Sequence, residues 1–195
     1  MPRTSTTAQQ LKEHVFAVNS TRVSLIAVQI GQGRLLEATA NIRRAISALQ
    51  DSADPAEQEL YGVTLRFSAQ LLSDAGERLI AEIKLRESIE VFERVGDNAS
   101  VQLAYSLSEL ACLCAAEGRF SEAHQQIVRA MNLLAASVAE ASGIQLQSQF
   151  ATAHPTIVRA LKRYLTALRS RGETARLEEA KRTFDAFDAA VRRTE

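Results

Sequence analysis

The sequence contains no tryptophan, and only 5 % of its 195 residues are aromatic. A β-sandwich or β-barrel normally carries more aromatic and β-branched residues in strict alternation, so this composition disfavours an all-β fold. Proline and glycine are also scarce, with three and eight residues respectively. Because both residues interrupt helices, their scarcity, together with 46 % hydrophobic residues, predicts a chain that is helical throughout.

Cysteine is nearly absent, and its two copies, Cys112 and Cys114, lie two residues apart. On a helix this spacing points them to different faces, so no disulfide is expected, and the pair lacks the two-residue gap of a redox or zinc motif. The N-terminus has no apolar signal core, and no apolar run approaching the ~20 residues of a membrane span stands out. We therefore expect a soluble protein in the reducing cytoplasm.

The sequence also lacks the usual signs of catalysis. His14, His124 and His154 are far apart and do not share a metal-ligand spacing. Neither a glycine-rich phosphate loop nor a serine nucleophile elbow is recognisable. The net charge is zero, with 23 basic and 23 acidic residues, which gives no reason to expect nonspecific binding to nucleic acid or membranes. We expect a protein that is not an enzyme and that binds no cofactor or metal.

What the sequence does contain is a short repeated pattern, in which a glycine is followed by small or apolar residues at steps of +5, +4 and +3. The three copies are Gly33-Ala38-Ile42-Ala45, Gly76-Ala81-Leu85-Ser88 and Gly118-Ala123-Ile127-Ala130. From the first glycine to the second is 43 residues, and from the second to the third is 42. A fixed period of this size is typical of stacked helical hairpins.

The helical periodicity predicts one repeat domain over residues 8–195, preceded by a disordered polar segment at 1–7. Its four hairpins are expected at about 8–51, 55–96, 98–141 and 155–193. Asp54 and Pro55 are a good N-cap and first helical residue. The fourth glycine, Gly172, follows Gly118 by 54 residues, which indicates an insertion at 141–154 before a helix expected to start at Pro155.

The first helix is expected to bury one apolar stripe. Its predicted members are Leu11, Val15, Val18, Leu25 and Ile26.

The repeated units resemble tetratricopeptide repeats (TPRs). The third unit carries the large, small and large residues of the first helix as Leu107, Ala111 and Cys114, and the second unit carries Leu65, Ala69 and Leu72. With units of about 42 residues, the chain is similar to the longer variants found in kinesin light chain and in bacterial regulators. The resemblance implies an all-α fold, a right-handed superhelical α-solenoid of about four antiparallel helix hairpins.

The resemblance also implies a concave groove, lined by the first helix of each hairpin, that receives a protein or peptide partner. Carried over position by position, the candidate partner-binding residues are Arg66, Gln70, Tyr105, Ser108, Arg159, Lys162 and Arg169. Gln70, Cys112 and Thr166 stand where a carboxylate clamp would need asparagine, so such a clamp is not expected.

Charge is distributed unevenly along the chain. Residues 51–97 contain 11 acids and 5 bases, whereas residues 155–195 contain 10 bases and 6 acids. The segment 159–171 has five bases and no acid. This basic face is interpreted as a solvated surface, as a docking site for an acidic partner, or as a contact for the acidic middle of another copy. Nucleic acid is the less favoured ligand, because Tyr164 alone interleaves the bases.

The function predicted from these features is that of a noncatalytic protein–protein interaction scaffold or adaptor, which binds a partner segment in the concave groove. Two alternatives stay open: a peptide-sensing regulatory domain of a bacterial signalling system, and a self-assembling TPR module that forms homo-oligomers.

Overall fold

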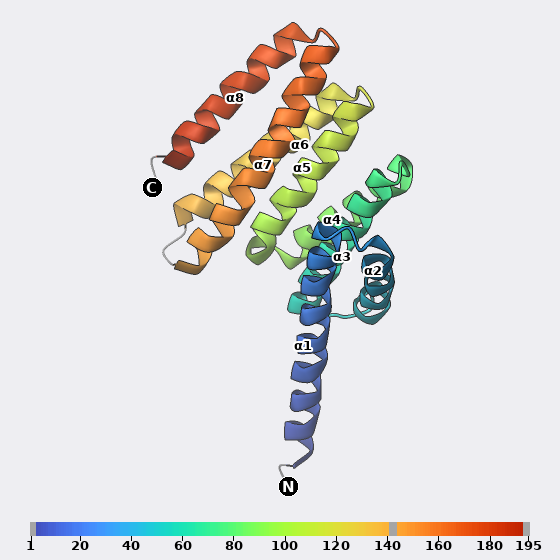
Figure 1. Cartoon of the computed structure of the whole chain (residues 1–195). Coiled ribbons are helices and arrows are strands. Elements are labelled where there is room, and N and C mark those ends of the chain that lie inside the picture. Colours follow the sequence, from blue (N-terminus) through green and yellow to red (C-terminus); the bar gives the residue numbers. More distant parts are fainter. Residues whose placement is uncertain (1–2, 141–143, 193–195) are drawn as a thin grey trace. The chain divides into compact units, whose positions relative to one another are not determined.

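The protein is all-α. The computed structural model describes residues 3–140 and 144–192, and in these residues eight α-helices pack as sequential antiparallel pairs, with no strand (Figure 1). The helices are α1 (Arg3–Gly31), α2 (Leu35–Leu49), α3 (Pro55–Asp74), α4 (Arg78–Val95), α5 (Ser100–Ala116), α6 (Phe120–Glu140), α7 (Ile144–Ser170) and α8 (Thr174–Arg192). A short 3-10 helix, η1 (Asp97–Ala99), precedes α5. The helical fold class expected from composition is confirmed.

The chain divides into two compact units, Met1–Val91 and Phe92–Glu195. In the first unit, α1 and α2 pack on each other and on α3. The buried core of this unit consists of Ile26, Ile42, Ala45, Leu49, Tyr61, Leu65 and Val91. Where α3 meets α4, the Ser88 hydroxyl donates a hydrogen bond of 2.9 Å to the carbonyl of buried Gly62. Small residues at this crossing let the two helices approach closely.

In the second unit, α5 packs against both α6 and α7, and α8 packs against α6 and α7. Twelve of the 17 residues of α5 are buried. The segment Asp97–Ala116 is long and apolar enough to cross a membrane, which corrects the expectation that no such run exists. However, 72 % of the 18-residue apolar window within it is buried in the protein, as is common for a core helix.

One turn geometry recurs at the tip of every pair. Gly33, Gly76, Gly118 and Gly172 all have positive φ, from 72° to 87°. Each glycine N–H donates to the carbonyl three residues earlier at 3.0–3.2 Å, and the next N–H donates to the carbonyl five residues earlier at 2.8–3.0 Å. These two bonds define a Schellman motif, which satisfies carbonyls that the end of a helix leaves open.

The return helix begins two residues after each glycine, and the residue between them precedes the helix as its cap. In the first turn the carbonyl of Arg34 accepts a hydrogen bond from Ala38, and the same bond recurs at Ala81, Ala123 and Leu177. The three alanines are fully buried. The +5 step of the sequence pattern therefore marks the residue whose N–H donates to the carbonyl of the cap residue after the glycine.

The start of α3 has the cap expected from the sequence. The carboxylate of Asp54 accepts from the backbone N–H groups of Ala56 and Glu57, at 2.9 and 3.3 Å. Pro55 occupies the first helical position, where a missing N–H costs nothing.

Two helix starts differ from those expected. Helix α1 begins at Arg3, so residues 3–7 are helical rather than a segment before the first helix. Helix α7 begins at Ile144, and Pro155 lies within it. Proline disfavours a helix interior, but good helix formers such as glutamine, leucine and alanine precede it, and helix is continuous on both sides. Residues 144–154 of the expected insertion therefore belong to α7, and residues 141–143 lie outside the described residues.

The apolar stripe expected on the first helix is wrong except at Ile26. Leu11, Val15, Val18 and Leu25 are exposed, and Ile26 is buried together with Asn19, Val23 and Gln29. For Leu11, Val15 and Val18 the physical reason is length, because α1 has 29 residues and α2 has 15, so α2 covers only the C-terminal part of α1. Leu25 lies within that part but on a different side of the helix from Val23 and Ile26. Buried Gln29 is satisfied by the side-chain amide of Asn41, which donates to it at 3.0 Å.

Two glycines that lie two residues apart provide a test of the turn. Gly33 has a φ of +72°, whereas Gly31 is a helical residue, and a methyl group added to either would meet no atom within 4 Å. We expect Gly33→Ala to lower the free energy of unfolding by about 1–2 kcal/mol, because an L-residue is strained in the left-handed region. Gly31→Ala should leave it unchanged or raise it by about 0.5–1 kcal/mol. Urea unfolding followed by circular dichroism measures the free energy of unfolding of both variants. Equal losses in Gly33→Ala and Gly31→Ala would contradict the explanation by left-handed backbone strain.

Candidate functional site

Helix α7 presents a basic face on the side opposite its buried face. Ile157, Leu161, Tyr164 and Leu168 are almost fully buried. At spacings of 3, 1 and 6 residues, the exposed cations Arg159, Lys162, Arg163 and Arg169 fall on one side of the helix. We call these four residues the α7 basic face. The helix is amphipathic, so packing of its apolar side directs the cations outwards.

The charge of the α7 basic face is not neutralised locally. Ile144–Ser170 contains no aspartate or glutamate. Among the described residues, none of the four cations forms an ion pair. In contrast, Arg119, Arg129, Arg176 and Lys181 on neighbouring segments of the same unit all pair with glutamates. Helix α7 therefore carries four exposed cations without a carboxylate partner among the described residues.

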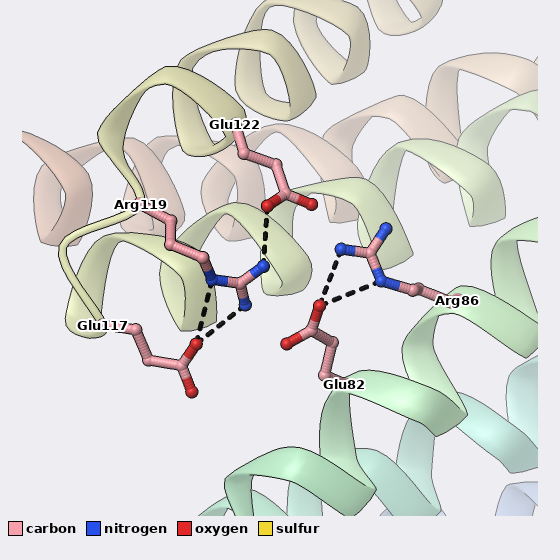
Figure 2. A network of polar contacts seen from close by, with 5 residues as sticks. All are labelled: Glu82, Arg86, Glu117, Arg119 and Glu122. Carbon is pink, nitrogen blue, oxygen red and sulfur yellow. Dashed lines mark hydrogen bonds and ion pairs between the residues drawn. The ribbon is translucent and has the colours of Figure 1, made fainter.

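Figure 2 shows two places where an arginine is paired with glutamates. The guanidinium of Arg119 lies between Glu117 and Glu122, at 2.8 and 2.6 Å. Within α4, the guanidinium of Arg86 donates twice to one carboxylate oxygen of Glu82, at 2.6 and 2.9 Å. Exposed pairs of this kind contribute at most about 1 kcal/mol each, but they leave the charges compensated.

The predicted groove residues of α3 lie in the first unit. Arg66 and Gln70 are half-buried and one helical turn apart. The Arg66 guanidinium lies over the Phe67 ring, 5.0 Å from its centroid. This cation–π contact holds the arginine against its own helix.

The predicted groove residues of α5 are not on an accessible surface. Tyr105 is 8 % exposed and Ser108 is fully buried, with its hydroxyl donating to the carbonyl of Ala104 at 2.7 Å. Because α5 packs against both α6 and α7, little of its surface is left open. The expectation that Tyr105 and Ser108 line an open groove is therefore corrected, whereas Arg159, Lys162 and Arg169 are exposed as expected.

Cys112 has a packing role. Its thiol donates to the Ala160 carbonyl of α7 at 3.4 Å. Burial raises the pKa of Cys112 to about 11, an effect opposed by the nearby Arg163 and strengthened by Glu109. The thiol is therefore protonated at neutral pH. Among the described residues, His, Cys, Asp and Glu do not form a group of three or more that could hold a metal ion.

A polar cluster that no sequence pattern indicated forms where α6, α7 and α8 meet. The ring of His124 lies 6.3 Å from that of Tyr164, and its Nε2 lies 3.6 Å from a Glu179 carboxylate oxygen. Arg176 donates to the Ser121 hydroxyl at 3.0 Å. These residues come from three helices at irregular separations, so no spacing pattern could have revealed them.

Tyr164 is the most deeply buried member of this cluster. Its side chain is inaccessible, and its hydroxyl has no hydrogen-bond partner among the described residues. Burial raises the pKa of Tyr164 to about 12; the Arg176 charge lowers it, and the charges of Glu179 and Glu173 raise it further. Tyr164 therefore acts as a neutral packing residue.

The outer side of α6 borders an open, mainly apolar hollow of about 530 Å³, lined by residues between His124 and Ala136. Arg129 stands at this hollow and pairs with Glu93 at 2.7 Å. Its lining includes the polar residues His124, Gln125, Arg129 and Asn132 beside Val128, Leu133 and Ala136.

No protein-family model matches the chain, and no curated protein is significantly similar to it.

The Tyr164 hydroxyl gives a prediction about stability. We expect Tyr164→Phe to leave the free energy of unfolding unchanged or to raise it by about 1 kcal/mol, because an unpartnered buried hydroxyl is costly. The control is Tyr61→Phe, which loses a hydrogen bond to Glu87 and should be destabilised by about 1 kcal/mol.

The raised pKa of Tyr164 also predicts how the stability of the wild type and of Tyr164→Phe depends on pH. An unfolded tyrosine ionises near its ordinary pKa of 10, whereas Tyr164 in the folded protein ionises near 12. The stability that depends on the neutral Tyr164 side chain is therefore fully present below pH 10 and is lost as the pH rises from 10 towards 12. Chemical unfolding at pH 8 and pH 11 should show a smaller loss in Tyr164→Phe than in the wild type; an equal loss would contradict this assignment.

The Cys112 thiol should react slowly in the folded protein. A rise in pKa from 9 to about 11 reduces the thiolate fraction at pH 8 about 100-fold, and the thiolate is the reactive form. Cys114 is fully buried. Absorbance after addition of a disulfide reagent should show both thiols reacting rapidly only after unfolding in urea. Rapid reaction of a thiol in the native protein would contradict the packing role.

Proposed function

We propose that the chain is a noncatalytic protein-interaction module of the TPR type, a scaffold or adaptor that binds an acidic segment of a partner protein on the α7 basic face. The proposal includes the stacking of its helix pairs into a superhelical solenoid, with α3, α5 and α7 as the first helices of successive hairpins.

Support for the repeat type comes from the regularity of the pairs. Four Schellman turns repeat one hydrogen-bond pattern, and fully buried alanines follow three of them at the same step. At the later small position, Ala45, Ser88 and Ala130 are fully buried as well. Units of equal local geometry are the building blocks of repeat proteins, in which each hairpin buries its apolar face against a neighbour.

The observation that carries the binding proposal is the uncompensated charge of the α7 basic face. Four exposed cations on a helix without acids attract a negatively charged segment and raise its rate of association. Arginine also forms bidentate hydrogen bonds with carboxylates, which adds geometric specificity. Such binding weakens with salt, because exposed charges are screened over about 10 Å at 0.1 M ionic strength.

The test is affinity capture from a lysate of the source cells, followed by mass spectrometry, with wild type and Lys162→Glu/Arg169→Glu. We expect a partner with an acidic segment to be captured by the wild type and to be reduced at least 10-fold in the variant. Capture should also fall as NaCl is raised from 50 to 500 mM. The matched control is Arg43→Glu/Arg78→Glu, which makes the same charge change at exposed positions of α2 and α4.

Two results would oppose the proposal. If the control loses the partner as strongly as Lys162→Glu/Arg169→Glu, net charge rather than the α7 basic face governs capture. If nuclease treatment removes the captured material, the ligand is nucleic acid.

A further inference from the structure

The N-terminal half of α1 is exposed at every side chain that the structure describes there. Thr7 and residues 9–18 are exposed, and Asn19 is the first buried residue among the described side chains of the helix. Figure 1 shows this part of α1 extending well beyond the end of α2. A helical segment alone in water derives little stability from its own hydrogen bonds, so an apolar face on it calls for a partner.

Such a face is present. Leu11, Val15, Val18 and Leu25 are 63 %, 41 %, 41 % and 42 % exposed. Their steps of 4, 3 and 7 residues follow the heptad spacing of a coiled-coil seam. We call these four residues the α1 seam.

The α1 seam is distinct from the face with which α1 packs on its own unit. That face carries Asn19, Val23, Ile26 and Gln29, which are buried. Gln29 stands seven residues after Arg22, so the α1 seam ends at Leu25. In an α-helix the two sets lie side by side on the surface, so α1 can contact its own unit and a second helix at the same time. Occupation of the α1 seam requires no rearrangement of the first unit.

We propose that the α1 seam is a dimerisation surface that binds the α1 seam of a second copy of this chain in antiparallel orientation. A contact between identical patches is self-complementary and closes after two copies. At the measured exposures the four residues present on the order of 300 Å² per copy, taking about 150–200 Å² for a fully exposed residue of this size. Two copies therefore bury on the order of 600 Å² of apolar surface at the seam, which is below the roughly 1,000 Å² of a stable specific interface and indicates a weak dimer.

The antiparallel orientation follows from Arg22, which fills the heptad position between Val18 and Leu25. Arg22 is half-buried and donates to the Asn19 side-chain oxygen. In a parallel pair the two Arg22 guanidinium groups would face each other and repel. In the antiparallel pair, Val15 meets Val18 of the second copy and Arg22 lies against its Leu11, so the charges are kept apart.

The composition of α1 favours a second copy over a membrane surface. A helix that lies in a membrane interface carries many lysines and arginines on its polar face. Between residues 9 and 28 the charged residues are Lys12, Glu13 and Arg22, and most other polar residues are uncharged. A seam with almost no net charge fits an equally uncharged partner, and a second copy supplies one.

The test is sedimentation velocity of the full chain from 1 to 200 µM. We expect the wild type to show a concentration-dependent monomer–dimer equilibrium and Val15→Glu/Val18→Glu to weaken it at least 10-fold. The control Leu36→Glu/Leu79→Glu makes the same change at apolar residues that are 89 % and 72 % exposed on α2 and α4, and it should dimerise like the wild type. A wild type that is monomeric throughout, or a control that loses the dimer equally, would overturn the proposal.

Disulfide trapping tests the orientation. A mixture of Val15→Cys and Val18→Cys chains should form mixed dimers under mild oxidation, whereas Val18→Cys alone should not crosslink; efficient crosslinking of Val18→Cys with itself would overturn the antiparallel pairing. The α1 seam is apolar, so dimerisation should persist in 500 mM NaCl, where binding to the α7 basic face is lost. The salt dependence therefore distinguishes a failure of dimerisation through the α1 seam from a failure of partner binding on the α7 basic face.

Discussion

The helix pairs all depend on one backbone constraint, the left-handed glycine at the turn of each pair. With φ between 72° and 87°, Gly33, Gly76, Gly118 and Gly172 allow the chain to reverse within a single Schellman motif. Other residues resist this conformation because their Cβ crowds the backbone. The turn fixes where the next helix begins, and hence which residues of that helix face its partner.

The packing of α7 determines where positive charge is exposed in the second unit. The apolar side of α7 is buried, so the exposed side holds the four cations of the α7 basic face. Arg119, Arg129 and Arg176 elsewhere in the unit pair with glutamates. A helix face with four exposed cations and no acid on the same helix offers a place for an oppositely charged partner.

Helix length has a comparable effect in the first unit. Helix α1 is 29 residues long and α2 only 15, so the N-terminal half of α1 remains uncovered. The packed face and the α1 seam lie side by side on one helix. The uncovered half is where the structure offers an apolar surface to a second copy, independently of the electrostatic site on α7.

The sequence by itself determined the helical class, the turn glycines, the Asp54 cap and the amphipathic pattern of α7, because these depend on neighbours within one or two helical turns. It misplaced the buried face of α1, the start of α7 and the accessibility of Tyr105 and Ser108. Likewise, no local pattern could bring His124, Tyr164 and Glu179 together. Only the tertiary structure decided these, because burial and contact depend on which helices pack together and how far each one extends along its neighbour.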